Sequence, residues 1–446
     1  MKLADQIVAQ LVDAGVRRIY GIVGDSLNPV VDAVRRTGGS AKGGIDWIHV
    51  RHEEAAAFAA AADAQLTGEL AVCAGSCGPG NLHLINGLYD ANRSHAPVLA
   101  IASHIPSAQI GTGYFQETHP DRLFVECSVY REMISSPQQS PRVVASAIRH
   151  AESLRGVAVL TLPGDLADEE ATAPTPAYRR AARPTLVPDE AVVTELAERI
   201  NAAGRVAIFA GAGVADAHNE VVELAGHLGA PVGHSLRGKD AIQHDNPYDV
   251  GMTGLLGYGA AAEGMKDADL LLLLGTDFPY DQFLPDVTTV QIDTAGEVLG
   301  RRTEVDLPIH ADVRATIAAV RPLLQPKDSR FLEATLKRHE KLMTKAVGAY
   351  THDVEDKTPI HPEYVASILD EVAAEDAVIT ADTGMCNVWT ARYITPNGRR
   401  RLIGSYLHGS MANALPQAIG AQFAHVAEHQ PGFTATGRQR VGEPVR

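Results

Sequence analysis

The sequence has few cysteines and lacks the pattern of a disulfide framework. Its four cysteines are Cys73, Cys77, Cys127 and Cys386, and no two of them form a CxxC pair. Cys73 and Cys77 lie close together but lack two further ligands at a spacing that suits a metal ion, so ordinary buried thiols are the favoured interpretation. Because proteins of a reducing compartment keep their thiols free, we expect a cytoplasmic protein.

Long apolar runs and clusters of basic residues are also absent. No apolar run is long enough to span a bilayer. Residues 1–16 form an amphipathic pattern that includes Asp5 and Asp13, which argues against a signal peptide. The formal net charge is −15 at pH 7, and no Lys/Arg cluster could follow a phosphate backbone. Nucleic-acid binding is therefore disfavoured.

The chain alternates short β-rich runs with helical patterns. Its 446 residues are enough for about three domains of ordinary size. We expect strands at residues 18–22, 47–50 and 70–74, with helices at 28–36 and 53–66 between them. Such alternation predicts an α/β fold, in which mostly parallel sheets carry helices on both faces.

Two changes in composition divide the chain. Residues 171–188 are rich in Pro, Ala and Arg without periodicity, which is typical of a linker. A third α/β unit begins near Pro359. The stretch from Glu428 has neither helical nor strand periodicity, and this lack is what a shifted reading frame would produce. We therefore expect the third domain to be incomplete. The expected domains are residues 1–170, 188–325 and 359–446.

The segment Arg51-His52-Glu53-Glu54 follows a predicted strand and opens a predicted helix. Acidic side chains in a first helical turn gain about 0.3–1 kcal/mol from the helix dipole, which is the purely structural explanation. The carboxyl ends of parallel strands are also where α/β sheets bind ligands. Adjacent helical residues point about 100° apart, so only one of the two glutamates can face a pocket. The segment is not HExxH, which excludes that zinc motif.

A glycine-rich loop, GSCGPGNLH, spans residues 75–83 between a predicted strand and a predicted helix. Its three glycines and its proline allow the backbone to approach a ligand closely and to begin a helix. A plain strand-to-helix loop explains the pattern equally well. His83, one turn into the helix, is more often a core histidine than a catalytic one.

The second unit carries several glycine- and threonine-bearing strand ends. Gly211 and Gly213 form an incomplete dinucleotide fingerprint, because Asp216 stands where the third glycine is required. Residues 251–254 and 275–279, with a later aspartate at a strand end, suit a long ligand whose diphosphate meets backbone amides. The alternative is a structural domain, in which these turns are retained but bind no ligand. A sirtuin-like NAD module is disfavoured by the incomplete fingerprint.

Six motifs appear in order along the chain: RHEEAAAFAA, GSCGPGNLHLINGLYDA, GYFQETHP, DNPYDVGMTG, LLGTDFPYD and HGSMANALPQAIGAQ. Over about residues 1–425 the series resembles the bacterial pyruvate oxidases (pyruvate:quinone oxidoreductases) of the thiamine-diphosphate decarboxylase family. GYFQETHP and DNPYDVGMTG favour this branch over acetolactate synthases and simple decarboxylases. The resemblance implies three doubly wound parallel-sheet domains: a pyrimidine-binding domain, a central FAD domain and an incomplete diphosphate-binding domain.

The resemblance also implies roles for particular residues. Glu53 matches the glutamate that hydrogen-bonds the aminopyrimidine of thiamine diphosphate and so promotes formation of the reactive carbanion. Phe115 and Gln116 match a pair that lines the substrate pocket, and His83 falls where the family places a polar group near the reactive carbon. Residues that match thiamine contacts are His408, Gly409, Ser410 and Met411. Residues that match FAD contacts are Gly211, Gly213, Met252, Thr253, Gly254, Leu255, Gly275, Thr276, Asp277, Phe278, Pro279, Asp293 and Asp312.

The sequence departs from the family at the metal site. The family holds Mg²⁺ with a Gly-Asp-Gly motif and a later Asn, and no Gly-Asp-Gly occurs here. We therefore assign no metal ligand in this chain, although Mg²⁺ is a cofactor of the family. The segment with which such quinone reductases contact lipid at the membrane periphery is missing as well.

The activity that the resemblance implies is oxidative decarboxylation of pyruvate to acetate and CO₂, with electrons passing to FAD and then to a quinone. Two alternatives stay open: an acetolactate-synthase-like enzyme, and an inactive truncated product that folds and binds FAD. In the family the active site lies between subunits, so we expect a homo-oligomer, with tetramers among full-length relatives.

Overall fold

The structure is a computed structural model that describes residues 1–428, and it divides into two compact units. The first unit contains Met1–Ala182, Thr380–Thr383 and the described residues from Ile403. The second contains Arg183–Ile379 and Gly384–Leu402. Residues 359–428 are thus shared between the two units, and the three domain boundaries expected from the sequence stay a prediction.

The first unit is built on a six-stranded sheet in the order β2-β1-β3-β4-β6-β5, in which every pair of neighbours is parallel. Its strands are β1 (Arg18–Gly21), β2 (Asp46–His49), β3 (Ala71–Gly75), β4 (Val98–His104), β5 (Tyr130–Met133) and β6 (Val157–Pro163). Its helices are α1 (Leu3–Asp13), α2 (Asn28–Arg36), α3 (Glu53–Thr67), α4 (Pro79–Leu82), α5 (Ile85–Arg93), α6 (Pro120–Leu123), α7 (Ser140–Leu154), α8 (Gly164–Asp168) and α17 (Ala414–Glu428).

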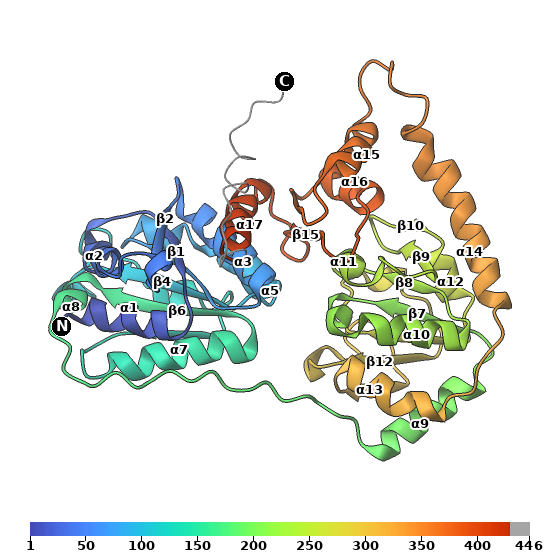
Figure 1. Cartoon of the computed structure of the whole chain (residues 1–446). Coiled ribbons are helices and arrows are strands. Elements are labelled where there is room, and N and C mark those ends of the chain that lie inside the picture. The colour runs from blue at the N-terminus through green and yellow to red at the C-terminus, as the bar shows by residue number, and fades with distance from the viewer. Residues whose placement is uncertain (429–446) are drawn as a thin grey trace. The chain divides into compact units, whose positions relative to one another are not determined.

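Helices cover both faces of this sheet (Figure 1), and its central strands β3, β4 and β6 are buried at every residue. Side chains alternate between two cores: in β3, Val72 and Ala74 face α1, α2 and α7, whereas Ala71 and Cys73 face α3 and α5. The fold class is therefore confirmed as α/β with parallel sheets. Cys73, Cys77 and Cys127 are buried free thiols, as the sequence indicated, and Cys386 is an exposed one.

The alanine-rich helix α3 packs unusually close to its neighbours. An added Cβ on Gly420 of α17 would lie 2.1 Å from the carbonyl oxygen of Ala59, so the two helices touch through backbone. A buried ion pair fastens the far end of α3 to the sheet, where the Arg18 guanidinium donates to Asp63 Oδ2 over 2.8 Å and Tyr20 Oη donates over 2.9 Å. The position of α3 is thus fixed along its length.

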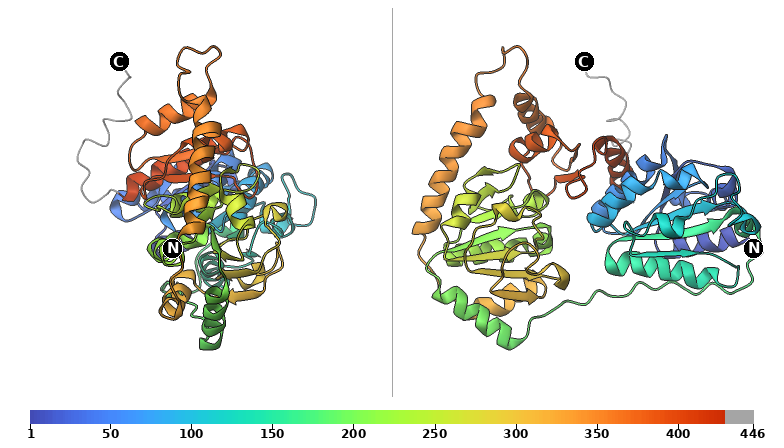
Figure 2. Two further views of the ribbon diagram at one scale, coloured as in Figure 1. Left: turned by 90° about the vertical axis from the view of Figure 1, so that its right-hand side faces the viewer. Right: turned by 180° about the vertical axis from the view of Figure 1, so that it is seen from behind.

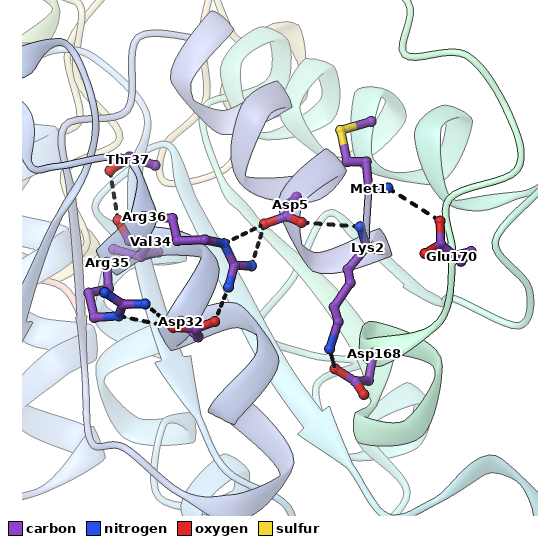
Figure 3. A network of polar contacts seen from close by, with 10 residues as sticks. All are labelled: Met1, Lys2, Asp5, Asp32, Val34, Arg35, Arg36, Thr37, Asp168 and Glu170. Carbon is purple, nitrogen blue, oxygen red and sulfur yellow. Dashed lines mark hydrogen bonds and ion pairs between the residues drawn. The ribbon is translucent and has the colours of Figure 1, made fainter.

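At the surface of the same unit, ion pairs connect α1 with its neighbours (Figure 3). Arg36 of α2 donates to Asp5 and to Asp32, and the Lys2 ammonium donates to Asp168 at the end of α8. These groups are exposed or half-exposed, so each pair contributes at most about 1 kcal/mol to stability. These pairs connect α1 with α2 and α8 at the surface of the unit.

The second unit is built on a seven-stranded sheet in the order β10-β9-β8-β7-β11-β12-β13. Only β10 is antiparallel to its neighbour. Its strands are β7 (Val206–Ala210), β8 (Val232–His234), β9 (Asp249–Met252), β10 (Tyr258–Gly259), β11 (Leu270–Leu274), β12 (Thr289–Asp293) and β13 (Leu307–His310). Its main helices are α9 (Glu190–Ala202), α10 (His218–Leu228), α11 (Lys239–Ile242), α12 (Ala261–Lys266), α13 (Val313–Val320), α14 (Arg330–Leu342), α15 (Pro362–Val372) and α16 (Met385–Tyr393).

Two layers of helices cover this second sheet as well. Helices α9, α10 and α13 pack on one face, and α12 and α14 pack on the other. The long helix α14 runs beside β9 and β10 and is clear in the view from behind (Figure 2). A separate two-stranded sheet joins β14 (Val378–Ala381) to β15 (Arg401–Gly404). Among the described residues, no helix combines the length and apolar character needed to cross a membrane.

The structure refines several sequence expectations. The predicted helix that follows the glycine-rich loop is broken into α4 and α5, which leaves His83 at the end of the short helix α4. Residues 171–188 form no helix or strand between α8 and α9, apart from one bridge at residue 170 just before them, as expected of a linker.

Residues of β8, β9, β10 and α11 form a buried polar cluster in the second unit, together with Gln243 just after α11. The Lys239 ammonium, 2% exposed, donates to Tyr258 Oη over 3.0 Å and to Gln243. Gln243 in turn donates to Asp249 over 3.1 Å, and the wholly buried His234 lies 3.4 Å from the same carboxylate. Burial lowers the pKa of Lys239 to about 8 and also lowers the pKa of His234.

The lowered pKa of Lys239 predicts how the free energy of unfolding changes with pH. An unfolded lysine has a pKa of about 10.4, so between pH 8 and that value the unfolded chain binds a proton that the folded chain has lost. The free energy of unfolding of the wild type, relative to Lys239→Met, should therefore rise over this window by about 1–3 kcal/mol. Urea titrations at a series of pH values measure it. A difference that stays constant with pH would refute the assignment.

Candidate active site

The carboxyl ends of β2, β3 and β4 meet at one edge of the first sheet, where three loops carry polar side chains. The first loop leads from β2 into α3. His52 caps α3, since its Nδ1 accepts a hydrogen bond from the backbone N–H of Glu54 over 3.2 Å. Glu53 opens the helix and is 8% exposed, whereas Glu54 is half-buried and points elsewhere. Of the two adjacent glutamates, only Glu53 is thus enclosed.

Glu53 has a specific partner in the second loop. Its Oε2 lies 3.0 Å from Nδ1 of His83, and the imidazole of His83 stacks on that of His52 with ring centres 4.4 Å apart. A buried carboxylate is stable only when it is hydrogen-bonded, so His83 compensates the burial of Glu53. The structure therefore places His83 beside a buried carboxyl group, and not within the hydrophobic core.

The glycines of the second loop permit two close approaches. Gly78, at φ +65°, leaves no room for a side chain, because an added Cβ would lie 2.8 Å from Cβ of Gln116. A Cβ on Gly80 would lie 3.3 Å from Oε1 of Glu53. Gln116 itself has a φ of +64°, a strained conformation for a residue other than glycine, and its Oε1 accepts from the thiol of Cys77 over 3.3 Å.

Glu53, His83 and Gln116 are thus gathered around one glycine-rich loop. Phe115, which the resemblance places beside Gln116 in the substrate pocket, is 78% exposed, and its role stays a prediction. The sequence signalled each of these residues, but it did not show that the loop residues 77 and 78 hold Gln116 in place.

One face of α5 binds the segment that carries the other expected thiamine contacts. Asn86 donates to Glu54 Oε1 over 2.5 Å and to Ser410 Oγ over 3.2 Å. Its amide oxygen lies 2.8 Å from Nε2 of His408, and because that oxygen only accepts, His408 must donate from Nε2. The His408 ring stacks on Tyr89 with centres 5.4 Å apart. Burial, with a further contribution from Arg93, lowers the pKa of His408.

Asp90, on the same face of α5, fixes the ends of this segment. Ser405 Oγ donates to Asp90 Oδ1 over 2.7 Å, and Gln417 of α17 donates to Oδ2 over 3.2 Å. Between these anchors Gly409 has a φ of +80° and Met411 is 76% exposed, so the loop tip projects outward. Sequence reasoning missed Asn86 and Asp90. Their spacing of four residues on one helix face, directly after the glycine loop, was the available signal.

The contacts of Asn86 lead to a prediction. Asn86→Leu removes three hydrogen bonds to Glu54, His408 and Ser410, each worth about 0.5–1.5 kcal/mol, and should raise amide hydrogen exchange in residues 407–411 by about tenfold. Mass spectrometry of exchanged peptides measures the effect. Asn201→Leu is the matched control, since it loses bonds to Leu323 and Gln325 within the second unit. Equal exchange in both variants would contradict the role of Asn86.

In the second unit the expected FAD contacts lie at the ends of β7, β9, β11 and β12. Gly211 and Gly213 pack against the loop after β11, where Gly213 N donates to Gly275 O over 3.0 Å. An added Cβ on Gly211 would lie 2.3 Å from that oxygen, so these glycines are required by loop packing whether or not a ligand binds. Thr276, Met252 and Phe278 are buried, whereas Leu255 is 63% exposed and Gly254 and Pro279 lie in the adjoining loops.

The acidic members of this set differ in their surroundings. Asp277 pairs with Arg301 and Arg302 at 2.9 and 3.0 Å. Asp293 lies at the end of β12, where burial raises the pKa of its carboxyl group. Asp312 caps α13 by accepting from the N–H of Ala315 over 2.8 Å, so its carboxylate already has a structural use.

One observation fits a ligand such as a flavin at these strand ends. The hydroxyl of Thr253 is buried without a hydrogen-bond partner in the described part of the chain. Mg²⁺ prefers oxygen ligands. Asp382, the acidic residue after β14, instead accepts from the N–H of Ala414 over 2.7 Å. One oxygen of Asp382 is thus already used, and the assignment of no magnesium ligand in this chain stays a prediction.

Comparison of this chain with known protein families identifies the class of protein to which its fold and candidate site belong. Three family models match in order: the N-terminal TPP binding domain over residues 1–123, the central domain over 193–320 and the C-terminal TPP binding domain over 382–437 of thiamine pyrophosphate enzymes. The chain belongs to the thiamine pyrophosphate enzyme family.

Individual relatives span most of the chain. A putative thiamine pyrophosphate-containing protein, YdaP, of Bacillus subtilis is 36% identical over 95% of this chain and 73% of its own length. The pyruvate oxidase of Lactiplantibacillus plantarum is 32% identical over 94% of this chain and 70% of its own length. An acetolactate synthase of Mycobacterium bovis is 30% identical over 94% and 69%. Both activities occur among relatives of similar identity.

Proposed function

We propose that this chain is a thiamine-diphosphate-dependent enzyme that decarboxylates pyruvate oxidatively, with FAD and then a quinone accepting the electrons. The observation that carries the proposal is the buried carboxyl group of Glu53, which lies beside His83 and beneath the glycine-rich loop at the carboxyl edge of the sheet. A side chain so enclosed and hydrogen-bonded is suited to holding a proton against a nitrogen base of a ligand.

Each residue of the site has a part in this chemistry. Glu53 holds the proton shared with the aminopyrimidine ring, and His83 fixes the orientation of the Glu53 carboxyl group through its 3.0 Å contact. Gln116 supplies an amide N–H₂ that can donate to the carboxylate of a 2-oxo acid, while the thiol of Cys77 occupies its amide oxygen. Thiamine diphosphate, when bound, supplies the electron sink for the carbanion that remains after CO₂ has left.

The other cofactor and partner assignments belong to the same proposal. Thr253 and the strand-end glycines of the second unit would hold FAD, and His408–Met411 would approach thiamine diphosphate at a loop held by Asn86 and Asp90. No Mg²⁺ ligand is assigned in this chain. The functional form is a homo-oligomer of at least two chains, and contact with a membrane surface would follow from a quinone acceptor.

An acetolactate-synthase-like activity is the second candidate. It is favoured by a relative of that name at 30% identity, close to the 32% of the pyruvate oxidase. The two activities diverge after decarboxylation, because only an oxidase transfers electrons to the flavin.

The role of Glu53 can be tested by Glu53→Gln, which keeps the shape of the side chain but cannot exchange the proton. With thiamine diphosphate and Mg²⁺ supplied, CO₂ release from labelled pyruvate should fall by about 10²–10⁴-fold. Glu69→Gln, on an exposed residue just after α3, is the control and should keep wild-type activity. Wild-type turnover by the Glu53 variant would refute the assignment.

The flavin distinguishes the candidates. We expect the purified chain, reconstituted with FAD, thiamine diphosphate and Mg²⁺, to lose its visible flavin absorbance when pyruvate is added without oxygen. Formation of acetolactate with the flavin still oxidised would favour the second candidate. Bound flavin with neither reduction nor CO₂ release would indicate a chain that folds and binds FAD without turning over.

A further inference from the structure

The imidazoles that surround Glu53 form a cluster with the composition of a metal site. In the part of the chain whose side chains are described, His52, Glu53 and His83 make up the one group of at least three such side chains whose ligand atoms all lie within 4.8 Å of one another. They come from two different loops, after β2 and after β3, which the parallel sheet brings to one edge. Sequence spacing alone does not reveal the cluster.

We propose that His52, Glu53 and His83 bind a zinc-class transition-metal ion. Two imidazole nitrogens and one carboxylate oxygen are a donor set that Zn²⁺ accepts with a fourth position left open, and Co²⁺, Ni²⁺ and Cu²⁺ bind similar sets. Mg²⁺ requires oxygen ligands, so this site is distinct from the magnesium site of the family.

The distances fit such an ion after a small adjustment. Ligand atoms about 2.0–2.1 Å from a tetrahedral zinc ion lie roughly 3.3 Å from one another. The Oε2 of Glu53 and Nδ1 of His83 are already 3.0 Å apart. Because the three ligand atoms lie within 4.8 Å of one another, His52 has to move by at most roughly 1.5 Å to complete the set, and its half-exposed side chain leaves it room to do so.

His52 should be the weakest of the three ligands. Its Nδ1 now accepts from the N–H of Glu54 and caps α3. Binding an ion through Nδ1 displaces that hydrogen bond directly, and binding through Nε2 places a proton on Nδ1, which can then no longer accept. Either route uncaps the helix, whereas Glu53 and His83 exchange only their contact with each other. Loss of His52 should therefore weaken the site less than loss of either partner.

An ion at this position would inhibit the enzyme. It would hold the carboxylate of Glu53, which the proposed function requires for the aminopyrimidine, so metal and thiamine diphosphate should exclude each other. This consequence rests on the proposed function, but binding of the ion does not.

Metal binding can be measured without any enzymatic activity. We expect the folded chain to take up one Co²⁺ with the intense visible absorption of a four-coordinate site, and Zn²⁺ to displace it. Glu53→Gln and His83→Gln should each weaken Co²⁺ binding by at least about tenfold, and His52→Asn by less. The glutamine at 83 can still donate a hydrogen bond to Glu53, so the site loses a ligand and the fold keeps its contact.

The matched control is a second histidine stack. His218 and His244 have ring centres 4.2 Å apart, and His218 Nδ1 contacts a backbone carbonyl in place of a carboxylate. His218→Asn should leave the Co²⁺ spectrum unchanged. The proposal is overturned if the folded wild type takes up no stoichiometric Co²⁺, if the variants at 53 and 83 bind it like the wild type, or if His218→Asn abolishes the site.

A competition experiment separates the ion from the proposed function. Addition of thiamine diphosphate and Mg²⁺ should raise the apparent Kd for Zn²⁺. If Zn²⁺ binds through the three residues and thiamine diphosphate does not compete, the metal site stands and the assignment of Glu53 to the aminopyrimidine fails.

Discussion

The contact between the buried carboxyl group of Glu53 and the imidazole of His83 is the interaction around which the candidate site is organised. A carboxylate removed from water must be hydrogen-bonded, and here its partner comes from a different loop. Helix α3 holds Glu53 at this place because its alanines allow close packing against the sheet and α17, and because Asp63 is tied to Arg18 and Tyr20. Helix α3 therefore holds the side chain of Glu53 in one position.

Glycines perform two different tasks in this chain. In the first unit, Gly78 and Gly80 bring a loop against Gln116 and Glu53. A side chain at Gly78 would block the approach to Gln116, and one at Gly80 would press on Glu53. In the second unit, Gly211 and Gly213 are explained by contact between two neighbouring strand-end loops. A glycine motif at a strand end is therefore evidence of close packing before it is evidence of a ligand site. The unpartnered hydroxyl of Thr253 is the feature that points to a ligand there.

Helix α5 connects the loop of residues 75–83 to the segment that carries His408 and Ser410. Asn86 and Asp90 share one face and together hold both ends of that segment, so the segment depends on α5 for its conformation. Under the two proposals, the same edge of the sheet would serve two chemistries. Glu53 would hold a proton for the aminopyrimidine, and His52, Glu53 and His83 together would bind a metal ion.

The sequence by itself determined the α/β class and the main strands and helices, because periodicity is a local property. The candidate residues came from the resemblance of six motifs to a family, and their roles stay a prediction. The sequence also indicated that only one of Glu53 and Glu54 could face a pocket. Tertiary structure alone decided that Glu53 is the enclosed one, that His83 is its partner, and that Asp312 is used as a helix cap. It also decided that residues 384–402 and the described residues from 403 group with different units. These outcomes depend on contacts between residues far apart in the chain, such as Asp90 with Gln417, and no local pattern encodes such a pair.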